Sequence, residues 1–501
     1  MFDALFTTTT EYKKLSHALS GKGACALFGL PASGRAQVYA ALCRQLDKPL
    51  CIVTPGEAEA TRFAADLNTL GIPAAVFPAR DYVLRPIEGT AREYEYRRLA
   101  VLGELVGGRL RAVAVPAEAL TQFTTPKEDF CANTRTLHAG DTLLRDDLLA
   151  ALFGAGYTRR AQVDGPGQFS VRGDIVDIFA PDQKMPVRME FWGDEIDTLH
   201  TFDLTTQRRE DAIDKFYLSP AREVLFGKPA DAAEQLRAFL AKQRGKKKTA
   251  MADCMAADLD LLDGGAVPVN MDKYLAVRYP HPATVLDYFD DPILVAEEPA
   301  SIREADRATA YRRGEELKSL ILDGVLCAGL DNLYADPSYL WSKTGHYRTI
   351  CAENFARSMP DQPLKDIINT PAHTLPAWNG EVAGLLEDLK PLCDAGYTVT
   401  LLAGTDRAAA GLARDLRDKG ILVTTDAAAA PAAGLVQVLA GHLSAGCEFP
   451  FVKYALLTGR AFGETSSQKK KRKKAKDALN SLTEITPGDL VVHQNHGIGR
   501  Y

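Results

Sequence analysis

The sequence lacks the features that mark a secreted, membrane-spanning or zinc-binding protein. Its nine cysteines are scattered along 501 residues. No two of them form a C-x-x-C pair, so neither a metal site nor a disulfide framework is indicated, which fits a reducing cytosol. The N-terminus has no basic segment before an apolar run, so we expect no secretion signal. No stretch of about 18 apolar residues occurs, so we expect no membrane span and a cytoplasmic location.

The chain also lacks an excess of positive charge. It carries 59 lysines and arginines against 65 aspartates and glutamates, a net charge of −6. This balance argues against overall attraction to nucleic acid, so any such contact depends on local basic clusters. The hydrophobic content of 46% with 25% charged residues is typical of soluble globular proteins. At this length we expect roughly three or four domains rather than one core.

A phosphate-binding loop is present without its working residues. Gly29 to Ala36 keeps the G-x-x-x-x-G frame, after the apolar strand segment Ala24–Phe28 and before the helical segment Ala36–Leu46, which is the context that the motif requires. Arg35 replaces the lysine, and its planar fork is a poor substitute for a compact point charge. Ala36 replaces the hydroxyl that binds Mg²⁺. The degenerate loop comprises Gly29, Ser33, Gly34, Arg35 and Ala36.

Two interpretations of this loop are open. The first is a nucleotide-hydrolase fold that is kept for its shape, with no ATP hydrolysis at the loop. The second is a chance G-x-x-x-x-G in a strand–helix turn. The sequence around the loop fits both of them.

Residues 1–126 are predicted to form an α/β domain, because apolar strands alternate with helices and so imply a parallel sheet with right-handed crossovers. The expected strands are Ala24–Phe28, Leu50–Thr54, Ala74–Phe77 and Ala112–Val115. Residues 216–374 are expected to complete this domain, with helices at Ala230–Lys242 and Ala300–Leu320 and a basic loop at Arg244–Lys248.

Residues 127–215 are predicted to form a small inserted α+β domain. A helix is expected at Leu143–Phe153. The expected strands are Gln168–Arg172, Ile175–Phe179, Val187–Phe191 and Glu195–Leu199. Apolar and charged residues alternate strictly from Val187 to Phe191, which indicates a half-exposed strand, and Gly193-Asp194 is the expected turn to the next strand.

Three further segments follow. Residues 375–460 are predicted to form a second small α/β domain, with Thr398–Ala403 as a strand, Arg407–Lys419 as a helix and Ile421–Thr424 as a strand. Residues 461–485 form a basic linker whose dense like charges stay solvated. Residues 486–501 begin a further domain, with a strand expected at Leu490–His493 and a turn at Gly497–Gly499. This strand then has nothing to pair with, and since a strand needs partners, we expect this last domain to be truncated.

Two segments of the chain resemble a known family. The first runs from Gly156–Arg160 through Gly167–Phe179 to Arg188–Asp197, and it is similar to the UvrA-binding domain shared by UvrB and the transcription-repair coupling factor (Mfd) family. The second, Gly488–Tyr501, resembles the opening of the RNA-polymerase-interacting domain of that family. With the altered phosphate loop, these segments favour the coupling factors over UvrB. The resemblance covers essentially the whole chain.

The resemblance implies a layout and an activity. It implies a UvrB-like module (1–126, 127–215 and 216–374), a third domain (375–460) and the start of the polymerase-binding domain. In the full-length family an ATP- and Mg²⁺-dependent motor walks on DNA and displaces a stalled RNA polymerase, while the UvrA-binding domain recruits UvrA. We expect this chain to keep the part that recruits UvrA to the stalled polymerase, to lack the motor, to be no enzyme, to need no cofactor, and to bind RNA polymerase weakly or not at all. The alternative is an ATP-dependent repair helicase subunit of the UvrB class.

The resemblance also implies the site residues. Arg159 and Arg172 match the arginines that meet acidic groups on UvrA, and arginine suits this because its fork makes bidentate bonds to carboxylates. Phe179 closes the same strand region and is a candidate apolar contact. The alternatives are solvated surface charges for the arginines and a core position for Phe179.

A basic run is the remaining candidate site. Lys469, Lys470, Lys471, Arg472, Lys473 and Lys474 could contact DNA phosphates, each with a salt-dependent contribution. The alternative for this run is a plain flexible tether.

Overall fold

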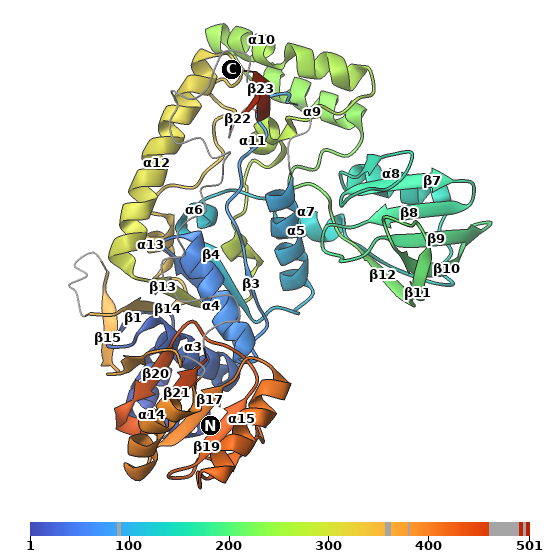
Figure 1. The fold of residues 1–501 in the computed structure, drawn as a ribbon. Coiled ribbons are helices and arrows are strands. Elements are labelled where there is room, and N and C mark those ends of the chain that lie inside the picture. The colour runs from blue at the N-terminus through green and yellow to red at the C-terminus, as the bar shows by residue number, and fades with distance from the viewer. Residues whose placement is uncertain (88–91, 356–361, 379–380, 460–489, 494–496, 501) are drawn as a thin grey trace.

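The computed structural model describes residues 1–87, 92–355, 362–378, 381–459, 490–493 and 497–500 (Figure 1). A large α/β body occupies the centre of the molecule. A β-rich unit that carries α8 projects from one side, helices lie at the top, and a second α/β unit lies beneath. The multidomain α/β fold class expected from the sequence is therefore confirmed.

The body is built on a seven-stranded, wholly parallel sheet with the order β15-β1-β14-β13-β2-β4-β3. Its strands are β1 (Gly23–Phe28), β2 (Leu50–Thr54), β3 (Ala74–Val76), β4 (Ala112–Pro116), β13 (Ile293–Glu297), β14 (Arg348–Glu353) and β15 (Leu364–Asn369). The predicted strands before residue 126 agree with these to within about a residue, because strands buried on both faces appear in the sequence as continuous apolar runs.

Two parts of the chain share this sheet. Strands β13 and β14 follow the inserted unit in sequence and lie between β1 and β2. Helices cover the sheet as parallel connections require. They are α3 (Ala32–Leu46), α4 (Glu57–Thr69), α5 (Glu93–Val106), α6 (Ala117–Leu120), α12 (Pro299–Leu322) and α13 (Tyr339–Lys343). The first helices of the chain, α1 (Phe2–Phe6) and α2 (Thr10–Ala18), pack beside α3 and β15.

The projecting unit is a six-stranded sheet with the order β11-β10-β9-β8-β7-β6. Its strands are β6 (Thr158–Arg159), β7 (Gln168–Arg172), β8 (Ile175–Phe179), β9 (Val187–Trp192), β10 (Glu195–Phe202) and β11 (Arg209–Ala212). One face packs on α8 (Arg145–Gly154) through apolar side chains such as Leu148, Leu152, Val176 and Met189. The chain enters and leaves through α7 (Lys127–Ala132) and the β5–β12 pair (Arg135–His138 and Lys215–Leu218).

A buried ionic network fixes this unit to the body. Glu223, just after β12, accepts from Arg98 of α5 at 2.6 Å and pairs with Arg80 at 3.2 Å. Arg80 also binds Asp272 at 2.7 Å. Burial opposes ionisation of Glu95, but the neighbouring arginines hold its pKa down at about 2. Removing one partner of such a network is costly because it leaves a buried charge uncompensated, so the segment that leaves the projecting unit is anchored to the body.

The helical region at the top corrects one prediction. Arg244–Lys248 was expected to be a basic loop, but all of it after Arg244 lies in the first turn of α10 (Gly245–Asp263). Lysine is a good helix former, and buried Met251 and Met255 anchor the helix to the core of this region. The other elements here are α9 (Pro229–Ala241), α11 (Leu275–Arg278), η1 (Met271–Tyr274) and η2 (Val285–Tyr288).

The lower unit has a six-stranded sheet with the order β16-β20-β21-β17-β19-β18. Its elements are β16 (His373–Leu375), α14 (Val382–Asp394), β17 (Thr398–Leu402), α15 (Asp406–Asp418), β18 (Val423–Thr424), β19 (Val436–Leu439), β20 (Gly446–Phe449), η3 (Pro450–Val452) and β21 (Tyr454–Thr458). Its side chains Leu443, Phe449 and Tyr454 share one apolar cluster with α1 and α3, so this unit is docked on the body.

The last described strands correct a second prediction. β22 (Leu490–His493) was expected to have no partner and to be followed by a turn at Gly497–Gly499. Instead, β23 (Gly497–Arg500) pairs with it in antiparallel register. Among the helices that the structure describes, none is long and apolar enough to cross a membrane, and the described residues contain no cluster of potential metal ligands.

Candidate functional site

The phosphate-loop frame forms the turn between β1 and α3. Gly29 has a φ of +89°, in the left-handed region that favours glycine. A Cβ there would lie 2.6 Å from Oδ1 of Asn369, at the end of β15. The glycine therefore permits both the turn and the close passage of the neighbouring strand. The segment therefore keeps the strand–turn–helix context of the motif.

Arg35 turns into the protein instead of reaching an open cleft. Its side chain belongs to a residue that is only 3% exposed. The guanidinium pairs with Glu297 through Nε at 2.9 Å and with Glu298 through Nη1 at 3.1 Å. Nη1 also donates to the Leu30 carbonyl and to Oδ1 of Asn354, each at 3.0 Å. Burial alone would lower the pKa of Arg35, but the Glu297 carboxylate raises it, so the guanidinium stays charged.

These acidic partners of Arg35 were not predicted from the sequence. Glu297 ends the buried strand β13 and Glu298 follows it. In working phosphate-loop enzymes, an acidic residue held by a strand binds the Mg²⁺ ion. Here Arg35 and the hydroxyl of Tyr39 bind Glu297 instead. The signal was available in the acidic pair after the apolar run Ile293–Ala296.

The lower unit covers the loop from outside. Ser33 is buried and its Oγ lies 3.5 Å from the carbonyl of Gly446 on β20. A Cβ on Gly34 would lie 3.0 Å from Sγ of Cys447. Ala36 is also buried, in the shared apolar cluster. The first turn of α3 therefore faces a strand of the lower unit where a phosphate-loop enzyme presents its backbone amides to nucleotide.

The second candidate site lies on the projecting sheet, on the face away from α8. Residues on this face alternate with those that pack on the helix. Asp177 of β8 is directly opposite Arg188 of β9 and Ser170 of β7. Arg188 binds the two carboxylate oxygens of Asp177 at 2.7 and 2.9 Å. Arg172 donates to the same carboxylate at 2.5 Å. We call this side of the sheet the outer face.

Arg172 is half-exposed while its partner is buried. Its side chain is 46% exposed, against 1% for that of Asp177. Arg172 ends β7 beside the tight turn at Gly173, whose φ is +61°, so the guanidinium stands at the rim of the outer face. The hydrogen bond to Asp177 raises the pKa of Arg188. Two guanidinium groups therefore share one carboxylate at this point of the face.

Trp192 is the exposed aromatic residue of the outer face. It is 82% exposed and ends β9, four residues after Arg188 and therefore on the same side of the strand. Tryptophan and arginine are the residue types that most often anchor protein interfaces. Sequence reasoning noted the alternation of Val187–Phe191 but did not extend it to Arg188 and Trp192 as candidates.

The structure does not bring the three predicted contact residues together. Arg159 is exposed on the edge strand β6, where its register partner Phe169 packs toward α8. Paired residues share one side of a sheet, so Arg159 lies opposite to Arg172. Phe179 is 6% exposed and packs with Val163 and Phe202. Its ring is therefore part of a small core, which is the alternative that the sequence left open for this residue.

The basic run Lys469, Lys470, Lys471, Arg472, Lys473 and Lys474 lies outside the described residues. Its expected contact with DNA phosphates therefore stays a prediction from the sequence.

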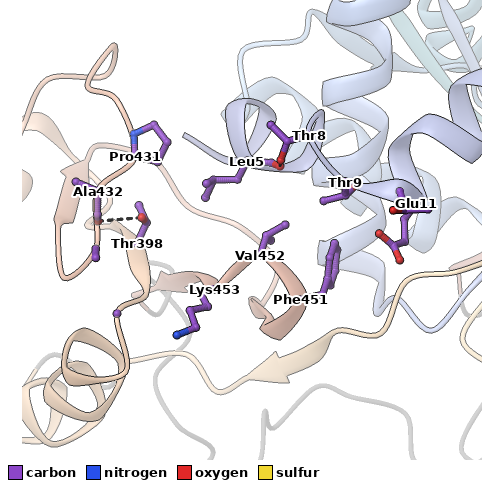
Figure 2. A pocket seen from close by; sticks show the side chains of 13 residues that line it. Leu5, Thr8, Thr9, Glu11, Thr398, Pro431, Ala432, Phe451, Val452 and Lys453 are labelled. Carbon is purple, nitrogen blue, oxygen red and sulfur yellow. Dashed lines mark hydrogen bonds between the residues drawn. The ribbon is translucent and has the colours of Figure 1, made fainter.

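A cavity of about 770 Å³ lies elsewhere, between the N-terminal helices and the lower unit (Figure 2). Three of its polar side chains are bonded to backbone. Thr8 Oγ1 donates to Leu5 at 2.7 Å, Thr398 Oγ1 donates to Ala432 at 2.9 Å, and Lys453 Nζ donates to Ala395 at 3.0 Å. Ligand sites need convergent polar groups, and these groups already have partners. The cavity is a crevice of the interface between the two parts.

Comparisons with known proteins single out the projecting sheet and also match most of the chain. Residues 136–224 match the family described as the UvrB interaction domain, which contains the whole outer face. The chain is 26% identical over 490 residues to the transcription-repair-coupling factor of Bacillus subtilis (strain 168), covering 95% of this chain and 41% of that protein. The corresponding protein of Staphylococcus haemolyticus (strain JCSC1435) is 26% identical over 491 residues, covering 94% and 41%.

A third relative agrees with these. The transcription-repair-coupling factor of Staphylococcus aureus (strain MRSA252) is 24% identical over 487 residues, covering 94% of this chain and 41% of that protein. The resemblance found in the sequence is thereby confirmed over nearly the whole chain. The chain spans about two fifths of the length of the curated relatives that it matches.

Proposed function

We propose that this chain, similar over nearly all its length to part of the transcription-repair coupling factors, recruits UvrA to an RNA polymerase stalled at DNA damage. The match of residues 136–224 to the UvrB interaction domain supports this proposal. The docking surface is the outer face, and the observation that carries the proposal is the pairing there of half-exposed Arg172 with buried Asp177. The guanidinium is held in place and still offers N–H groups to an acidic partner.

The chemistry of the outer face suits a protein partner. An arginine fork makes paired, charge-assisted bonds to a carboxylate, and Trp192 offers a large apolar surface at little cost in conformational entropy. Interfaces draw most of their affinity from a few such residues. We therefore assign the contact to Arg172 and Trp192 on the outer face, with Arg159 of the edge strand outside it.

We further propose that the phosphate loop hydrolyses no ATP. The position of the lysine is taken by Arg35, which is paired internally with Glu297 and Glu298. The first turn of α3 is covered by β20. On the family resemblance, ATP-dependent movement along DNA belongs to a separate motor. The loop here acts as a folding and docking element.

A binding measurement tests the recruiting role. Arg172→Ala should weaken binding of purified UvrA by about 2 kcal/mol or more, roughly thirtyfold, because it removes an interface anchor. Isothermal titration of the full chain with UvrA measures this. Arg135→Ala is the matched control, since Arg135 is exposed on β5, outside the outer face. Equal affinities of wild type and Arg172→Ala would refute the proposal.

A further inference from the structure

Asp177 occupies an unusual position for a carboxylate at a docking face. Its side chain is 1% exposed and lies under two guanidinium groups. A buried carboxylate needs compensating charge and hydrogen bonds. Asp177 accepts three hydrogen bonds from the two arginines. The aspartate is therefore fully engaged by residues of its own face.

The two arginines use this carboxylate differently. Arg188 binds it through two nitrogens, donates a further bond to the Gln207 carbonyl at 3.2 Å, and stacks over the Phe202 ring at 4.7 Å. Its side chain is only 11% exposed. Arg172 gives Asp177 a single nitrogen, Nη2, and keeps nearly half of its side chain in solvent. Arg188 thus immobilises Asp177, and Asp177 orients Arg172.

We propose that Asp177 is a positioning residue for docking: it holds Arg172 in the orientation in which the rest of its fork meets a carboxylate of the partner. This inference rests on the proposed recruiting function and names the device that prepares the site. Preorganisation increases affinity because the side-chain entropy of the interface arginine is lost on folding rather than on binding. Asp177 itself is too deeply buried to touch the partner.

Charge and orientation make opposite predictions, so the inference can be tested. Asp177→Asn removes a negative charge from a face that attracts an acidic partner. If net charge governed docking, the variant would associate faster and bind more tightly. If orientation governs docking, the variant dissociates faster because Arg172 is no longer held. We expect association to be unchanged or faster and dissociation to be about tenfold faster or more, as for loss of an interface anchor.

Surface plasmon resonance with immobilised UvrA at two ionic strengths separates these rates. Asp177→Glu, which keeps the charge, should bind more nearly like wild type than Asp177→Asn. In an Arg172→Ala background, Asp177→Asn should have little further effect, because the residue acts through Arg172. Near-ultraviolet circular dichroism and unfolding midpoints confirm that each variant is folded.

A second variant keeps the test decisive should Asp177→Asn fail to fold. Arg172→Lys alters a half-exposed residue at a strand end. A lysine whose ammonium group binds Asp177 has no further nitrogen to offer to the partner. We therefore expect this variant to lose nearly as much affinity for UvrA as Arg172→Ala. Wild-type affinity of Arg172→Lys, or wild-type or tighter binding by folded Asp177→Asn, would overturn the inference. Unchanged binding by Arg172→Ala would instead remove the proposed function itself.

Discussion

Asp306 on α12 holds a carboxylate where water is largely excluded. Burial raises its pKa from an ordinary 3.8 to about 6, although Arg313 opposes this shift. The folded state therefore keeps its proton to a higher pH than the unfolded state. The contribution of Asp306 to the free energy of unfolding is most favourable below pH 3.8. It falls as the pH rises from 3.8 to about 6, and it stays unfavourable at higher pH.

Asp306→Asn should consequently stabilise the protein at alkaline pH. We expect the free energy of unfolding to rise by about 1 kcal/mol near pH 8, an estimate reduced for residual solvent screening. The gain should vanish below about pH 4, where the native carboxyl group is already protonated. Urea unfolding at both pH values measures the difference. Glu304→Gln, exposed on the same helix, should change little, and a gain that is independent of pH would contradict the account.

At the scale of elements, the β1–α3 turn differs from a working phosphate loop in more than its sequence. Restoring the motif with Arg35→Lys and Ala36→Ser should not create binding of Mg²⁺-ATP. β20 would still cover the first turn of α3, where the phosphates would have to bind. Titration with a fluorescent ATP analogue measures this, with an active phosphate-loop ATPase as positive control. Saturable, Mg²⁺-dependent binding would show that the substitutions alone disabled the loop.

Elements with a strong local pattern could be predicted from the sequence. The buried strands β1, β2 and β4 are continuous apolar runs, and the alternation in β9 matched a half-buried strand. The first turn of α10 could not be predicted in this way, because its basic residues also suit a loop and the helix depends on packing at Met251 and Met255. The pairing of β22 with β23 was missed for a related reason, since glycines at Gly497 and Gly499 suggest a turn.

The candidate site was only partly predictable. Arg172 came from the family resemblance, and the structure places it on the outer face. Arg188 and Trp192 depend on the register between β8 and β9, which the sequence does not state. Phe179 was a predicted candidate that the structure places in a small core with Val163 and Phe202. Its position in a strand could not distinguish a surface ring from a buried one. The ion pair of Arg35 with Glu297 joins residues far apart in sequence through the strand order of the sheet.

At the scale of the whole molecule, the lower unit is docked on the body through the altered loop. Phe449 packs against Phe2 of α1, with ring centroids 4.6 Å apart. Ser444 binds Asp66 of α4 through its amide at 2.8 Å and its hydroxyl at 2.6 Å. Cys447 lies against Gly34. The loop is therefore part of a contact between units, and its small residues permit the close approach of β20.

A double-mutant cycle tests this contact. A Cβ at Gly34 would crowd the thiol of Cys447, so Gly34→Ala should be tolerated better in a Cys447→Ala background than in wild type. We expect a favourable coupling of about 1 kcal/mol in the free energy of unfolding, as for residues in contact. Gly314→Ala serves as the control, because nothing lies within 4 Å of a Cβ at that helical position. Strict additivity at Gly34 and Cys447 would mean that the two units do not meet there.

The central claim is that the outer face of the projecting sheet docks UvrA. Calorimetric titration of UvrA into Trp192→Ala and Leu322→Ala tests it most directly, since both side chains are exposed but Leu322 ends α12, outside the projecting unit. The account predicts a loss of about 2 kcal/mol for Trp192→Ala and wild-type affinity for Leu322→Ala. Wild-type affinity for Trp192→Ala, with a loss for Leu322→Ala, would contradict it.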